Sequence, residues 1–242
     1  MNIRGGAGRA LTGALVVTLS ACAVRLGGPS PQEYDAVALR ASGDAAALGQ
    51  RLRAAGAELV LLAADQDSSW FAQVAASAQL GLSGPGTTGG SGLALLSNLK
   101  LLGDTALAIA IEGGGQLHMQ DALYEIDKNR HLDLMLVRLD PEAPLRASVR
   151  TLLGYIATDV GGAASVLLAI EAPSPMAADS TALLLRAAFE QANDCRGRGP
   201  AADAAAQTVR LFYGPQARID CVRAGPLDGS PAPTLARVVV RG

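Results

Sequence analysis

Short apolar runs recur along the chain between breaks rich in glycine and proline, and no other feature constrains the fold as strongly. The runs at residues 58–63, 93–96 and 165–170 are almost wholly apolar. Runs of this length and composition are typical of strands that are buried on both faces. Half of all residues are hydrophobic, so the chain has enough apolar side chains to form a core around such strands.

Segments with helical spacing alternate with these runs. They are found at residues 44–55, 70–79, 145–158 and 180–193. In the first, Leu48 and Leu52 lie four residues apart, which places them on one helix face. Two further apolar runs flank a polar turn at residues 127–130, which indicates a β-hairpin. Because strands outnumber helices and fall into two sets, the sequence predicts a layered α/β sandwich.

Charge and aromatic content argue against nucleic acid as a partner. The chain has 20 Lys and Arg residues against 22 Asp and Glu, and its formal net charge is −2. Beyond the N-terminus these residues form no basic block, whereas phosphate binding needs a clustered positive surface. Aromatic residues make up 3% of the chain, so the stacking surfaces that bind single strands are scarce as well.

The N-terminus has the order of a secretory signal. Arg4 and Arg9 precede an apolar run at residues 10–17, which is too short to span a bilayer. This run leads into the sequence Leu-Ser-Ala-Cys, which ends at Cys22. The sequence resembles the bacterial lipobox. That resemblance implies removal of residues 1–21 and attachment of lipid, such as palmitate, to Cys22, so that the protein is anchored to a membrane.

The lipobox resemblance also implies a location and a domain plan. The protein is expected at the cell envelope, and Ala23 after the lipidated cysteine favours the periplasmic face of the outer membrane. Residues 22–33 contain glycines and prolines and are expected to form a tether. One folded domain is expected at residues 34–242. An ordinary signal peptide with a chance cysteine is the alternative.

The remaining cysteines predict a disulfide. In an oxidising compartment Cys195 and Cys221 are expected to bond to each other, and two free buried thiols are the alternative. The only histidines are His118 and His131. Since neither lies at ligand spacing from a cysteine, no metal site is expected from these residues.

Six segments carry a further resemblance through their sequences and their order. They are residues 57–64, 92–97, 121–140, 166–173, 218–222 and 230–233. In that order they resemble the motifs P-D-V-V-x-L-Q-E, G-x-A-I-L-S, the hairpin leading to V-x-x-x-H-L-D, V-I-L-x-G-D-F-N, R-I-D-Y-I and S-D-H-x-P. These motifs belong to the endonuclease/exonuclease/phosphatase family. The resemblance covers nearly all of residues 34–242 and implies a four-layer α-β-β-α sandwich.

The same resemblance implies that catalytic groups have been lost. Ala64 stands where active members have a metal-binding glutamate, and alanine offers no oxygen ligand. Pro173 replaces a water-orienting asparagine. Arg138 and Ala232 replace two histidines, and an arginine does not act as a general acid or base. The asparagine expected on the first strand falls near Arg40.

Five acidic residues remain as candidates for a displaced site. Glu171, Asp140 and Asp220 lie within matched segments, and Asp65 or Asp67 follows the second core strand. The competing interpretation is that they are solvated carboxylates at loop ends, or partners of nearby arginines. No carboxylate pair is placed by spacing as in glycoside hydrolysis.

These observations favour an inactive relative that binds an envelope protein or a small ligand through its former active-site cleft. Two alternatives remain open. One is an active metal-dependent phosphodiesterase or phosphatase that uses rearranged carboxylates, and only this alternative requires a cofactor, Mg²⁺. The other is a purely structural envelope lipoprotein. The arrangement of Asp140, Glu171 and Asp220 distinguishes them, because an enzyme needs these side chains together in an open cleft.

Overall fold

A computed structural model describes residues 31–83, 92–128, 130–160, 165–191, 197–198, 208–215, 218–227 and 234–241. Cys22, Cys195 and Ala232 lie outside these residues, so the predicted lipid attachment and disulfide stay predictions. The first strand begins at Gln32. Two residues that were expected in the tether are therefore part of the folded domain.

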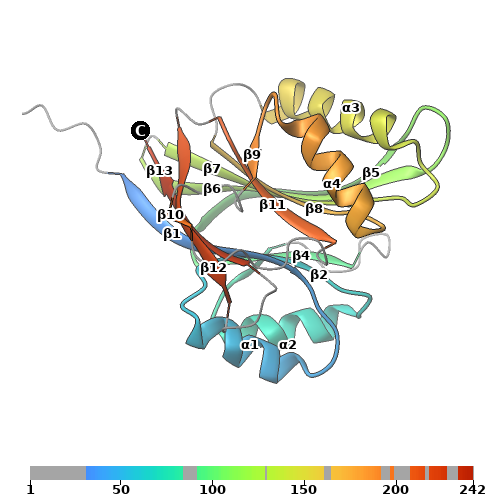
Figure 1. Cartoon of the computed structure of the whole chain (residues 1–242). Coiled ribbons are helices and arrows are strands. Elements are labelled where there is room, and N and C mark those ends of the chain that lie inside the picture. The colour runs from blue at the N-terminus through green and yellow to red at the C-terminus, as the bar shows by residue number, and fades with distance from the viewer. Residues whose placement is uncertain are drawn as a thin grey trace, which may run out of the picture.

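Two mixed sheets pack face to face, as Figure 1 shows. Within the described residues, sheet A has the strand order β10-β12-β13-β1-β2-β4-β3, and sheet B has the order β5-β6-β7-β8-β11-β9. The strands of sheet A are β1 (Gln32–Arg40), β2 (Leu59–Ala63), β3 (Leu82–Ser83), β4 (Leu93–Ser97), β10 (Gly197–Arg198), β12 (Ile219–Pro226) and β13 (Thr234–Val240). Those of sheet B are β5 (Lys100–Ala110), β6 (Gln116–Asp127), β7 (Arg130–Leu139), β8 (Ser165–Glu171), β9 (Glu190–Gln191) and β11 (Val209–Gly214).

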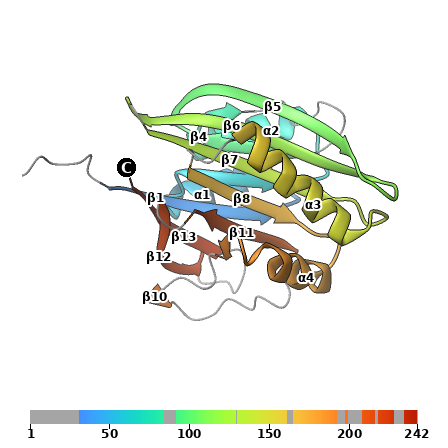
Figure 2. The same ribbon diagram turned by 90° about the horizontal axis from the view of Figure 1, so that it is seen from above.

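A pair of helices covers the outer face of each sheet (Figures 1 and 2). Sheet A is covered by α1 (Ala45–Ala54) and α2 (Ser68–Ala78), and sheet B by α3 (Leu145–Tyr155) and α4 (Pro175–Leu185). A π-helical turn, Ile156–Val160, continues α3. The predicted four-layer α-β-β-α sandwich is confirmed. Among the described residues, none of the helices combines the length and the apolar composition needed to cross a bilayer.

The core has three apolar layers, one between the sheets and one under each helix pair. Leu61, Leu95 and Leu134 are fully buried between the sheets. Burial of each such leucine contributes about 2 kcal/mol before entropic costs. Under α1 and α2 the helices approach closely, because a Cβ on Gly49 would lie 2.5 Å from the Cβ of Ser77. The strands therefore meet apolar side chains on both faces, as their sequences predicted.

Side chains at the N-termini of α1, α2 and α4 cap free backbone N–H groups of the first turn. Asp44 accepts hydrogen bonds from the backbone N–H groups of Ala46 and Ala47, and Asp67 accepts one from Trp70. At α4 the sequence interpretation was wrong by about a turn at the start and two turns at the end. Ser174 caps that helix and Pro175 occupies its first turn, and proline is favoured there.

β5 spans Lys100–Ala110, and its first half was not among the strands predicted from the sequence. Its first six residues are exposed, because β5 forms the edge of sheet B. An edge strand contacts the core weakly, so its sequence need not carry the apolar pattern of a buried strand.

Candidate functional site

Four charged side chains meet where strands of the two sheets end. Arg40 is the last residue of β1, and Asp65 follows β2, which runs parallel to β1. Arg138 lies near the end of β7 and pairs in register with Glu171, the last residue of β8. Each strand pair is parallel, so its two carboxyl ends lie together, and the ion pairs between the sheets place both pairs of ends at one edge of the sandwich. We call these four residues the charge ring.

Each arginine of the charge ring contacts both carboxylates. Arg138 donates from Nε to Oε2 of Glu171 at 2.6 Å, and its Nη1 lies 3.4 Å from Oδ1 of Asp65. Arg40 forms ion pairs with Asp65 through Nη2 and with Glu171 through Nη1. Two of the four ion pairs cross between the sheets. The ring therefore joins the two layers and has no net formal charge.

Burial differs sharply around the charge ring. The Glu171 side chain is 4% exposed and that of Arg138 is 20% exposed, whereas Asp65 is 67% exposed. Burial lowers the pKa of Arg138, the nearby Asp65 opposes this shift, and Arg40 adds to it. A guanidinium nevertheless stays protonated in proteins. Glu171 is thus a buried carboxylate whose two oxygens are both bound by arginine.

The backbone closes tightly around Ala64, which stands where active members of the family have a metal-binding glutamate. Ala64 is fully buried, and its N–H donates to the carbonyl oxygen of Gly92 at 2.8 Å. Gly92 has a positive φ of 58°, and a Cβ there would lie 2.0 Å from the carbonyl oxygen of Ala64 and 3.4 Å from Nη1 of Arg138. Glycine is therefore required at this position, and Ala64 contributes no ligand.

Two buried donors beside the charge ring lack acceptors among the described residues. They are Nη2 of Arg138 and Nε2 of Gln120, whose side chain is 1% exposed. On β6, Gln120 pairs with Leu136 and His118 pairs with Arg138, so all three polar side chains lie on the inner face of sheet B. Sequence reasoning missed Gln120, although a glutamine between strand residues that face the core was a usable signal.

The other predicted carboxylates do not join the charge ring. Asp140 accepts hydrogen bonds from the backbone N–H groups of Glu142 and Gln116, and these bonds lower its pKa. Asp67 caps α2, and hydrogen bonds from Ser69 and Trp70 lower its pKa.

Asp220 of β12 accepts a hydrogen bond from Arg241 at 2.9 Å. Within the part of the chain that the structure describes, no three His, Cys, Asp or Glu side chains are grouped as metal ligands. Of the sequence candidates, only Glu171 and Asp65 are brought together. Cys221 is buried in the layer between the sheets, but its predicted partner Cys195 is outside the described residues.

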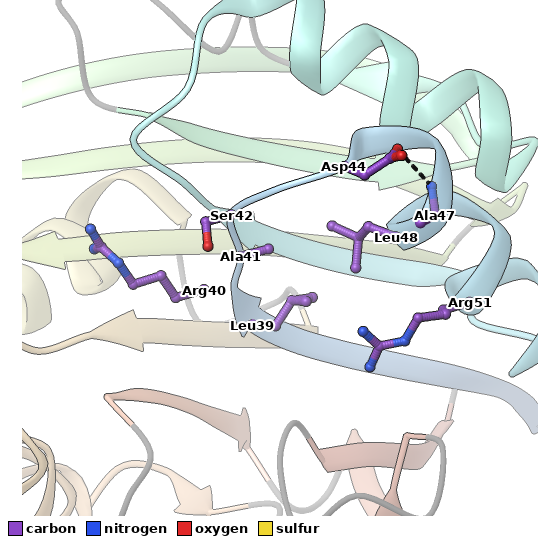
Figure 3. Close-up of a pocket in the computed structure, with 8 residues that line it drawn as sticks. All are labelled: Leu39, Arg40, Ala41, Ser42, Asp44, Ala47, Leu48 and Arg51. Atoms are coloured by element: carbon purple, nitrogen blue, oxygen red, sulfur yellow. Dashed lines mark hydrogen bonds between the residues drawn. The ribbon is translucent and has the colours of Figure 1, made fainter.

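A pocket of about 360 Å³ lies between the end of β1 and α1. Figure 3 shows Arg40 on one side of this pocket and Arg51 of α1 on the other, with Asp44 at the helix start. The remaining lining residues are Leu39, Ala41, Ser42, Ala47 and Leu48. The pocket therefore combines an apolar floor with two cations, one of which belongs to the charge ring.

Comparison with known proteins identifies the fold. No family model matches the sequence, and no curated protein matches it. Among solved structures, an endonuclease/exonuclease/phosphatase from Bacteroides vulgatus is similar with a TM-score of 0.64 and 14% identity, covering 87% of this chain and 100% of that one. A family protein from Bacteroides thetaiotaomicron is similar with a TM-score of 0.63 and 10% identity, covering 87% and 98%.

A third similar structure is D. rerio TDP2 in complex with a single-strand DNA product. Its TM-score is 0.58 at 12% identity, and the match covers 86% of this chain and 98% of that one. At such identities the likeness establishes the fold and leaves the chemistry to the residues themselves. The chain has the fold of the endonuclease/exonuclease/phosphatase proteins, as its six ordered segments predicted.

Proposed function

We propose that this domain is a non-catalytic ligand-binding relative of these enzymes, tethered to the cell envelope by lipid on Cys22. The observation that carries the proposal is Glu171, whose two carboxylate oxygens are both bound by arginine. Metal-assisted hydrolysis needs carboxylate oxygens that are free to hold a cation or activate water. Because Glu171 is buried between Arg40 and Arg138, removing either arginine to free it is costly.

The charge ring has one partner that a ligand can replace. Asp65 is 67% exposed, and exposed ion pairs contribute only about 0–1 kcal/mol. Arg40 binds Asp65 and Glu171 through different nitrogens. An anionic ligand can therefore take the place of Asp65 on Arg40 while Glu171 stays paired.

The pocket beside Arg40 supports a small ligand. Its volume of about 360 Å³ is within the range of small-molecule sites. Leu39 and Leu48 offer apolar contact, and Arg51 supplies a second cation across the pocket from Arg40. The ligand that fits this chemistry is a small molecule with an anionic group and a short apolar part.

Binding is tested by NMR titration of the soluble domain with inorganic phosphate, phosphate monoesters and dicarboxylates. We expect shifts at amides of the β1–α1 segment, and about tenfold weaker binding for Arg51→Gln, since a charge-assisted hydrogen bond contributes about 1.5 kcal/mol. Arg53→Gln is the matched control, because Arg53 is exposed on the same helix and does not line the pocket. Equal affinity in both variants, or no shift in these amides, contradicts the proposal.

The tether has its own test. Cys22→Ser should leave the precursor uncleaved or release the protein from the membrane fraction, because only this thiol carries the lipid in the proposal. Mature Cys22→Ser protein that still sediments with membranes contradicts the lipid anchor. Neither outcome depends on the binding experiment.

A further inference from the structure

On the outer face of sheet B, two aspartates lie beneath the C-terminal end of α3. In the β6–β7 ladder Asp121 pairs with Met135 and Leu123 pairs with Asp133, so the aspartates are diagonal neighbours on one face. Asp133 is 4% exposed. Asp121 accepts a hydrogen bond from the hydroxyl of Tyr155, the last residue of α3, at 2.7 Å. We call Asp121 and Asp133 the acid pair.

The acid pair has no cation to neutralise it among the described residues. Oδ1 of Asp133 is buried without a hydrogen-bond donor. The opposing residues on the outer strands are Thr105 of β5 and Val166 of β8, and neither carries charge. A buried carboxylate in such surroundings requires a compensating positive charge.

The charged groups around the acid pair do not supply that charge. Lys100 of β5 is bound to Glu125 of β6 at 2.5 Å. His131, two residues before Asp133 on β7, is exposed. The π-helical turn adds another acid, Asp159, whose charge acts on Tyr155. The basic residues of α3, Arg146 and Arg150, are exposed.

We propose that Asp121 and Asp133 share one proton, and that this protonated pair, with Tyr155, fastens the end of α3 to sheet B. When the end of α3 lifts, Asp133 enters water and gives up the shared proton. Attachment of this segment is therefore strongest in acid and weakens as the pH rises. This attachment is separate from the charge ring, because the acid pair lies on the outer face of sheet B, whereas Arg138 and Glu171 of the charge ring lie on its inner face.

The pKa shifts of Asp133 and Tyr155 agree with a proton shared by the acid pair. Burial, followed by the hydrogen bond to Asp121 and its charge, raises the pKa of Asp133 to about 9. Burial and the hydrogen bond to Asp121 also raise the pKa of Tyr155, so its hydroxyl stays a donor. In the lifted state Asp133 returns to a pKa of about 4.

The two pKa values of Asp133, closed and lifted, determine in which direction pH changes the attachment of α3 and over which pH range. The closed state holds one proton more than the lifted state at every pH between the two pKa values. The equilibrium constant for lifting therefore rises by about tenfold per pH unit across the neutral range. The π-helical turn contains no buried residue, so few apolar contacts oppose its release.

Amide hydrogen exchange of residues 155–160 between pH 5 and 8 tests the proposal. After correction for the intrinsic pH dependence of exchange, protection should fall by about tenfold per pH unit. Asp133→Asn keeps the shape of the neutral acid and should remove this slope. Asp159→Asn and His131→Asn change exposed groups nearby and should keep it. Amides of α1, on the opposite outer layer, serve as the internal reference.

Three results would overturn the proposal. The first is an equal slope in the wild type and in Asp133→Asn. The second is an Asp133 carboxyl carbon whose NMR resonance titrates below pH 5. The third is loss of the slope in wild-type protein when millimolar calcium is added, because a metal cation would then hold the pair in place of the proton.

Discussion

The two faces of sheet B neutralise buried carboxylates in different ways. On the inner face Glu171 is bound by Arg40 and Arg138. On the outer face Asp133 is hydrogen-bonded to Asp121, and no cation among the described residues pairs with it. Arg138 and Asp133 both belong to β7, five residues apart, and the alternation of a strand places them on opposite faces. Arginine keeps its charge at every physiological pH, so the ion pairs of the charge ring do not change with pH. A shared proton can leave, so the charge of the acid pair does change with pH.

The largest effect is expected from breaking the charge ring. Arg138→Met leaves the buried Glu171 with one partner and should lower the free energy of unfolding by about 3–5 kcal/mol. Urea denaturation at neutral pH measures the loss. The double variant Arg138→Met/Glu171→Met should recover most of it, because no buried carboxylate remains unpaired. A single variant as stable as the wild type would show that Glu171 is well hydrated.

A smaller effect of opposite sign is expected from the acid pair. The pKa of Asp133 is raised in the folded protein, so the unfolded state binds fewer protons and stability falls as the pH rises from about 4 to 9. Asp133→Asn removes this penalty and should stabilise the protein by about 1–3 kcal/mol at pH 8, with little change at pH 4. Thermal denaturation across this pH range measures the difference. A variant that is less stable at pH 8 would contradict the shared proton.

The smallest effect is expected at an exposed ion pair on sheet A. Arg237 binds Asp35 with two hydrogen bonds, at 2.9 and 2.7 Å, and its side chain is 46% exposed. Arg237→Met should therefore cost less than about 1 kcal/mol, and added salt should reduce the difference further. A loss as large as that of Arg138→Met would mean that burial does not set the strength of these pairs.

Much of the fold could be predicted from sequence because its buried strands have a clear signal. The runs that became β2, β4 and β8 are buried at every residue, so each was visible as a continuous apolar stretch. The first half of β5 carried no such signal, because its side chains are exposed at the edge of the sheet. The start of α4 was missed because Ser174 and Pro175 were not recognised as a cap and first turn.

The candidate site was predictable only in part. The family motifs placed Glu171 and Arg138 at matched positions, and the asparagine expected on the first strand fell near Arg40. The sequence did not determine that both arginines would bind the same carboxylate, because β1 and β8 belong to different sheets and meet only in the packed sandwich. The acid pair was missed for a related reason. Asp121 and Asp133 lie twelve residues apart and become neighbours only through the register of the β6–β7 hairpin.

We propose that the pairing of Glu171 with Arg40 and Arg138 leaves this domain without hydrolytic activity. The direct measurement is turnover of nucleic acid, inositol phosphates and sphingomyelin by the purified domain, with magnesium or manganese present. We expect no hydrolysis above that of a Glu171→Gln variant, because Ala64 and Pro173 offer no ligand and the carboxylate oxygens of Glu171 are both bound. Metal-dependent turnover that disappears in Glu171→Gln would contradict the account and establish a rearranged enzyme.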